Sequence, residues 1–177
     1  MNTLHTLLLP ALLALSVASC SSNKRSANGS ADSNTNTQSA NTSLGGAAAG
    51  DSLFFFLERT PCFGACKAYR ISVYRSGYAR YEGRSNVEKE GLHEGRIGQD
   101  TLATLLKEAE AMGFFDLQDS YDGQVTDLPS TIVRIVTKDK DKRVLARVGT
   151  PPAFKAYVEQ VETLLLPVPW RPIPAQH

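Results

Sequence analysis

The sequence lacks an apolar stretch long enough to cross a membrane. Its main apolar run lies in residues 7–16, whereas a spanning helix needs about 20 residues. An excess of charge of one sign is also missing, because residues 51–177 hold 17 Lys and Arg against 17 Asp and Glu. A formal charge of zero gives no bulk attraction to nucleic acid or anionic lipid. We therefore expect no nucleic acid partner.

Histidine and cysteine are scarce, with three of each among 177 residues. Only His93 and His177 lie beyond residue 20, which is too few for a zinc site built from His and Cys spacing. Nucleophile elbows, glycine-rich phosphate loops and catalytic triads are missing as well. We expect no catalytic residues, no metal and no cofactor, and a noncatalytic role rather than that of an enzyme.

The first 20 residues predict a lipoprotein signal peptide. The apolar core is followed at once by Val17-Ala18-Ser19-Cys20, which resembles the bacterial lipobox. In that motif a lipid is attached to the cysteine, so we expect Cys20 to be the first mature residue and a membrane anchor; acyl chains anchor stably without a spanning helix. Ser21 at the next position favours, by the same resemblance, the outer membrane, with the rest of the chain in the periplasm or at the cell surface.

Residues 21–50 predict a disordered tether. They contain seven Ser, five Asn, three Thr, six Ala and four Gly, and Leu44 is their only large aliphatic residue. Such a composition cannot offset the conformational entropy lost on ordering. A flexible coil of this length has ends on the order of 30 Å apart, which would hold the folded part clear of a membrane.

Residues 51–177 can build a core, and their patterns predict a single α+β domain. Alternating or short apolar runs predict strands at 52–58, 69–74, 78–83, 92–97, 131–137 and 143–148. Apolar spacings of three and four predict amphipathic helices at 100–112 and from Pro152 onward. The order strands, helix, two strands, helix favours a mainly antiparallel sheet of about five to six strands packed by two helices.

Residues at the ends of these helices predict how they begin and end. Gly98 or Asp100 is placed to cap the first helix and Gly113 to end it. The hydroxyl of Thr150 is expected to cap the second helix, which has proline in its first turn. A proline-rich tail from about residue 167 cannot continue that helix, and we expect Trp170 to dock this tail onto the domain.

Several pieces of the domain resemble one bacterial family, catalogued as domain of unknown function 6438. The similarity runs from about residue 53 to 166, and the Cys-Phe-Gly-x-Cys motif is its most specific part. The family has no established activity, so the resemblance implies the domain boundaries and a bacterial envelope setting without a mechanism. The pieces that carry it are residues 59–66, Tyr69, residues 77–83, residues 113–115, Asp119, Tyr121 and residues 126–129.

Cys62 and Cys66 are the cysteines that remain once Cys20 is lipidated. An even pair in an exported chain predicts a disulfide, and closing a loop of five residues contributes about 2 kcal/mol of stability. The alternative is thiol-redox exchange or Cu(I) binding, because the same spacing occurs in copper chaperones of thioredoxin fold. In those proteins a helix follows the pair, whereas residues 67–73 alternate like a strand, so we favour the structural disulfide.

Four aspartates form a candidate cation loop around Gly123. Carboxylate-rich loops suit hard cations such as Ca²⁺, but the spacing here is not that of an EF-hand. Aspartates that cap turns are the favoured alternative. The four residues are Asp116, Asp119, Asp122 and Asp127.

Tyrosines gather in the hairpin predicted at residues 68–84. Because Tyr69 and Tyr74 are opposite in phase along one strand, the tyrosines cannot all face the core. The candidate binding surface for a partner is Tyr74, Tyr78, Tyr81 and Arg80. Cross-strand pairs that only stabilise the sheet are the alternative.

These features together predict a membrane-anchored cell-envelope lipoprotein of unknown biochemical activity. Its α+β domain is expected to act as a noncatalytic binding or structural module, with an envelope protein as the expected partner. A thiol-redox or copper-handling protein that uses Cys62 and Cys66 is the alternative function.

Overall fold

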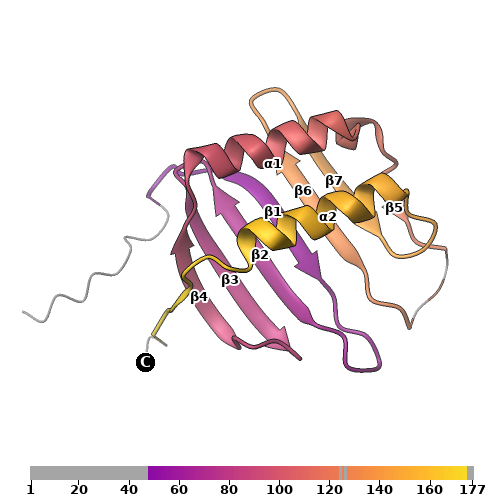
Figure 1. Ribbon diagram of the computed structural model, residues 1–177, viewed down its shortest axis with the longest axis horizontal. Helices are drawn as coiled ribbons and strands as arrows, with labels where there is room; N and C mark the ends of the chain where they lie inside the picture. The colour runs from indigo at the N-terminus through magenta and orange to yellow at the C-terminus, as the bar shows by residue number, and fades with distance from the viewer. Residues whose placement is uncertain (1–47, 124, 126, 175–177) are drawn as a thin grey trace, which may run out of the picture. The chain divides into compact units, whose positions relative to one another are not determined.

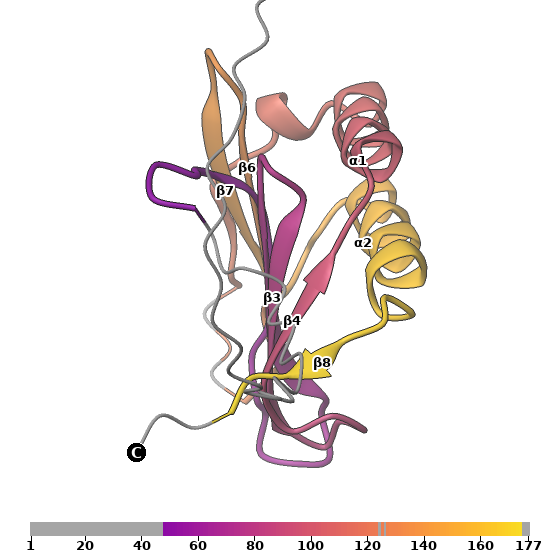
Figure 2. The same ribbon diagram turned by 90° about the vertical axis from the view of Figure 1, so that its left-hand side faces the viewer.

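The computed structural model describes residues 48–123, 125 and 127–174. The predicted signal peptide with Cys20, and the predicted tether up to residue 47, lie outside the described residues. The described part forms one sheet with two helices on one face (Figures 1 and 2). Its elements are β1 (Leu53–Arg59), β2 (Ala68–Tyr74), β3 (Tyr78–Ser85), β4 (Gly91–Arg96), α1 (Gln99–Ala111), η1 (Phe114–Asp116), β5 (Ser120–Tyr121), β6 (Thr131–Val136), β7 (Asp141–Ala146), α2 (Pro152–Leu165) and β8 (Arg171–Pro172).

The sheet has the order β5-β7-β6-β1-β2-β3-β4-β8. Its neighbours pair antiparallel, apart from the parallel pair β5 and β7. The central strand β1 shows why one face is buried: Phe55 and Leu57 are fully buried, while Phe56 and Glu58 alternate with them and point to the other face. The two-residue strands β5 and β8 form the edges, which limits the length of unpaired backbone there.

The predicted α+β class and the two helices are confirmed, whereas the strand count and order differ in detail. The sheet has eight strands instead of five to six, because β5 precedes β6 and β8 follows α2. Strands of two residues carry no alternation that a sequence pattern could show. The strand β7 also begins at Asp141 instead of residue 143, because Thr137 N donates to Lys140 O at 2.7 Å and closes the turn early.

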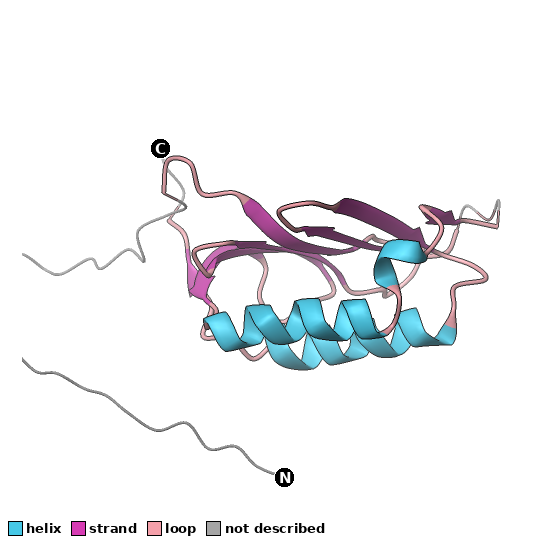
Figure 3. Ribbon diagram, turned by 90° about the horizontal axis from the view of Figure 1, so that it is seen from above, coloured by secondary structure: helices cyan, strands magenta, loops and turns pink. Residues whose placement is uncertain are grey.

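The helices lie side by side and run in opposite directions across one face of the sheet (Figures 1 and 3). The Tyr157 hydroxyl of α2 donates to Leu105 O of α1 at 2.9 Å. The buried residues recur at the spacings of three and four that predicted these helices; they are Leu102, Leu105 and Ala109 in α1, and Phe154, Tyr157, Val158, Val161 and Leu165 in α2. Among the described residues, no helix combines the length and apolarity needed to cross a bilayer.

The ends of the helices agree with the predictions in part. Gly98 is the N-cap of α1, and Gly113 follows its C-cap with a φ of 75°, the left-handed conformation that favours glycine. The predicted Thr150 cap is wrong. The N-cap of α2 is Pro151 and makes no side-chain cap hydrogen bond, because the helix begins one residue later than a Thr150 cap would allow.

The C-terminal tail docks onto the domain as expected. Trp170 is 8% exposed, its Nε1 donates to Leu165 O at 3.2 Å, and its ring centroid lies 5.5 Å from that of Tyr81. The strand β8 then extends the sheet beside β4 (Figure 2). Gly95 of β4 makes this approach possible, since a Cβ there would lie 3.1 Å from the indole ring.

Candidate functional site

The face of the sheet opposite the helices is the candidate functional site. Within the described residues no helix covers it (Figure 2). The strand register places every second side chain on this open face, and the charged ones include seven arginines and four carboxylates. They are Arg70, Arg80, Arg84, Arg96, Arg134, Arg143, Arg171, Glu58, Glu82, Glu94 and Asp141.

The helical face is closer to balance. The helices α1 and α2 together carry two lysines, Lys107 and Lys155, against five carboxylates. The strands add Arg59 and Lys142 to the helical side, which therefore has one more anion than cations, whereas the open face has three more cations than anions. The fold therefore gives the open face an excess of cations, although residues 51–177 are neutral overall.

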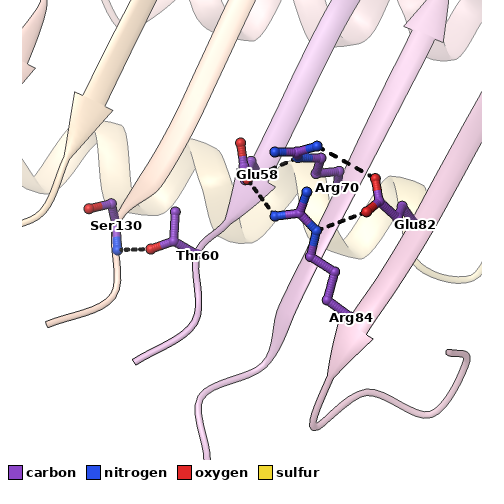
Figure 4. Close-up of polar contacts among 6 residues, drawn as sticks. All are labelled: Glu58, Thr60, Arg70, Glu82, Arg84 and Ser130. Carbon is purple, nitrogen blue, oxygen red and sulfur yellow. Dashed lines mark hydrogen bonds and ion pairs between the residues drawn. The ribbon is translucent and has the colours of Figure 1, made fainter. Parts of the chain in front are cut away.

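A closed ionic network crosses three neighbouring strands of the open face (Figure 4). Glu58 Oε1 accepts from Arg70 Nε at 2.9 Å and from Arg84 Nη1 at 3.0 Å. Glu82 completes the ring, at 2.9 Å from Arg84 Nε and 3.6 Å from Arg70 Nη1. The Glu58 side chain is 10% exposed, so its charge is held mostly out of water by two guanidinium groups. This network fixes the arginines in position.

A hollow of about 180 Å³ lies next to this network. Ser72, a small residue at the centre of the open face, leaves the space among longer neighbours. The walls combine two guanidinium groups, one carboxylate, two aromatic rings and one aliphatic side chain that is 42% exposed. These are Arg70, Arg80, Glu82, Phe56, Tyr74 and Leu92.

Tyr74 and Tyr78 are adjacent on the open face, with ring centroids 5.8 Å apart. The Tyr78 hydroxyl donates to Glu94 Oε2 at 3.3 Å. Burial raises the pKa of Tyr78 above its ordinary value, and the charge of Glu94 adds to the rise. The hydroxyl is therefore neutral at neutral pH and serves as a hydrogen-bond donor.

Only three of the four residues of the predicted binding surface share a face. Tyr74, Tyr78 and Arg80 lie on the open face, where Tyr78 is only 4% exposed, whereas Tyr81 lies on the helical face, where it is 5% exposed and stacks on Tyr69 at 5.7 Å. The assignment of Tyr81 to the binding surface is wrong. Its position one residue after Arg80 places it on the opposite face.

The family comparison supports the domain as one unit. The model of the family described as "Domain of unknown function (DUF6438)" matches residues 54–165. The chain belongs to this family. The match of the DUF6438 domain runs from β1 to the end of α2, and so includes most of the open face. The comparison with curated proteins gave no match.

The paired cysteines of the DUF6438 domain lie in the loop between β1 and β2. Their Sγ atoms are 1.97 Å apart, at disulfide distance. Cys66 leads into the strand β2, so the helix N-terminus that lowers thiol pKa in thioredoxin-fold proteins is not in this position. Phe63 within the loop is fully exposed, a feature that the motif alone does not reveal.

The four aspartates of the candidate cation loop are not brought together as one ligand set. Asp119 Oδ1 lies 2.6 Å from Lys142 Nζ, and Asp122 Oδ1 lies 2.8 Å from Arg147 Nη1. Across the ranges that the structure describes, no three His, Cys, Asp or Glu side chains are grouped to hold a metal ion. Among the described residues the structure gives the cation-loop hypothesis no support, because protein cations already pair with two of the four carboxylates.

Sequence reasoning missed the ionic network of the DUF6438 domain. Part of the network could have been predicted from the alternation of residues 69–74, which puts Arg70 and Ser72 on the same face as Tyr74. The same period in β3 aligns Arg80, Glu82 and Arg84. Which strands are neighbours, and therefore that Glu58 meets two of these arginines, depends on long-range pairing that the local pattern does not contain.

Proposed function

We propose that the chain is a cell-envelope lipoprotein, anchored through a lipid on Cys20, whose DUF6438 domain binds an acidic segment of an envelope protein on its open face. The domain acts as a noncatalytic binding module. The excess of cations on the open face carries this proposal, since electrostatic complementarity guides association and selects partners.

The residue types of the open face suit a protein partner. Arginine and aromatic residues are enriched in protein interfaces, where they supply most of the binding energy. Arg70 is held in place by Glu58 and Glu82, and a fixed arginine loses little conformational entropy when it binds a carboxylate. The hollow at Ser72 can accept an apolar side chain between the carboxylates of such a partner.

Arg80 and Arg143 are the best positions to alter. Both are exposed, and neither makes an ion pair with another described residue. Reversing their charge therefore changes the open face without breaking the network around Glu58.

A labelled peptide rich in Glu with one Phe is the probe for this proposal. Fluorescence anisotropy at low salt measures its affinity for the full chain, for the double variant Arg80→Glu/Arg143→Glu and for the control Lys107→Glu on α1. We expect the double variant to weaken binding at least tenfold and the control to bind like the wild type. Equal weakening in both variants, or no binding to the wild type, would contradict the proposal. Preferential binding of anionic lipid vesicles over the peptide would also contradict it.

The anchor is tested separately from the binding. Cells grown with labelled palmitate should incorporate the label into the wild-type chain and not into a Cys20→Ser variant, and the wild type should fractionate with membranes. A wild-type chain that carries no label would refute the lipoprotein assignment while leaving the peptide measurement unaffected.

A further inference from the structure

A polar cleft of about 240 Å³ lies on the helical side of the sheet, away from the open face. It is bounded by the end of β1, the ends of β6 and β7, and the first turns of α2. The volume is many times the roughly 10–15 Å³ needed by one water. Its lining includes three cations, Arg59, Arg147 and Lys155, and one carboxylate, Glu159.

Two side chains, Glu162 and Thr131, fix the position of the Arg59 guanidinium. Its Nε donates to Glu162 Oε1 at 2.8 Å, and its Nη1 donates to Thr131 Oγ1 at 2.6 Å. The Tyr69 hydroxyl donates to the same carboxylate oxygen. Burial alone would lower the pKa of Arg59, but the hydrogen bond and the charge of Glu162 outweigh it and raise the pKa above its ordinary value. The guanidinium is therefore permanently charged and fixed at the wall of the cleft.

Arg147 is held in a similar way on the other side. Its Nε donates to Ser130 Oγ at 2.9 Å, and its Nη1 lies 2.6 Å from Val125 O and 2.8 Å from Asp122 Oδ1. Ser130 is itself fixed, because its backbone N donates to Thr60 Oγ1 at 2.7 Å (Figure 4). The cleft thus presents two prepositioned guanidinium groups, one from the end of β1 and one from the residue that follows β7.

The groups of the cleft offer hydrogen-bond donors to an anion, although Glu162 and Asp122 already pair with Arg59 and Arg147. Guanidinium groups fixed by other contacts bind carboxylate and phosphate oxygens with good geometry, and the hydroxyls of Thr131 and Thr150 also line the cleft. Lys155 adds a third cation and is exposed, with no ion pair among the residues that the structure describes. We propose that this cleft binds a small oxyanion, a carboxylate or a phosphate group, independently of the partner at the open face.

A titration of the full chain with inorganic phosphate and with N-acetylalanine tests this site and separates the two sources of the oxyanion. Amide chemical shifts locate the binding, and chloride keeps the ionic strength constant. We expect one of the two probes to shift the amides of Thr131, Thr150 and Lys155. The probe that binds more tightly identifies the ligand class.

Variants of exposed lining residues give effects of opposite sign. Lys155→Met removes a charge-assisted contact and should weaken binding roughly tenfold, whereas Glu159→Gln removes a repelling carboxylate and should tighten it. Lys107→Met on α1 is the matched control and should bind like the wild type. The proposal is overturned if neither probe binds, if the shifts map to the open face, or if Lys155→Met and Lys107→Met bind equally well.

Discussion

Replacing Glu58 by Gln should destabilise the domain measurably. The side chain is 10% exposed and one of its oxygens accepts from both Arg70 and Arg84. A charge-assisted hydrogen bond contributes about 1.5–3 kcal/mol and a neutral one about 0.5–1.5 kcal/mol. The two arginine side chains are 40% and 30% exposed, so solvent screening reduces the difference. We expect Glu58→Gln to lower the free energy of unfolding by about 1–2 kcal/mol.

Urea denaturation of the full chain, followed by the fluorescence of Trp170, is the assay. The loss should appear as a lower midpoint with an unchanged slope, and it should shrink in 1 M NaCl, where the screening length is about 3 Å. Glu88→Gln is the matched control, since the Glu88 side chain is 90% exposed, and it should leave the midpoint unchanged. A Glu58→Gln variant as stable as the wild type at low salt would refute the reasoning that the network is stabilising.

Three further predictions concern the tail, the disulfide loop and the buried tyrosines. Trp170→Ala should cost about 2–4 kcal/mol in thermal or urea unfolding, because it removes a buried aromatic side chain; a change below about 0.5 kcal/mol would mean that the tail is not docked. Changing Cys62 and Cys66 to Ser should lower the free energy of unfolding by about 2 kcal/mol and leave the circular dichroism spectrum native-like, whereas loss of the fold would show that the loop holds the whole domain together. Burial, followed by the charge of Glu108, raises the pKa of Tyr157 above its ordinary 10.0, so its neutral form is favoured in the folded state. The stability that this contributes is complete below pH 10 and is lost as the pH rises above 10, by at most about 1.4 kcal/mol per pH unit for one tyrosine. In urea titrations at increasing pH, Tyr157→Phe should reduce this loss of unfolding free energy. An unchanged dependence of the unfolding free energy on pH would contradict the raised pKa of Tyr157.

Local patterns predicted the elements that are long and regular. The spacing of Leu102, Leu105 and Ala109 located α1, and the alternation of residues 69–74 located β2. The face on which a side chain lies follows from its position in the alternation of the strand. The position of Tyr74 on the open face could therefore also be predicted from the sequence. Residue phase likewise would have placed Tyr81 inside, since it follows Arg80 directly.

Contacts between residues that are distant in the sequence could not be predicted from local patterns. Arg59 and Glu162 are separated by 103 residues, and nothing near either residue marks the other as its partner. The same holds for the excess of cations on the open face, because residues 51–177 contain equal numbers of cations and anions and only the strand register assigns them to a face. The cleft beside α2 depends on three chain segments that meet only in the folded domain.

Amide chemical shifts of the full chain during titration with the acidic peptide test the central claim most directly. The account predicts that the shifts concentrate on the open face, at Ser72, Tyr74 and Arg80, and that they vanish in the Arg80→Glu/Arg143→Glu variant. Shifts confined to α1 and α2, or a full response from the charge-reversed variant, would contradict it.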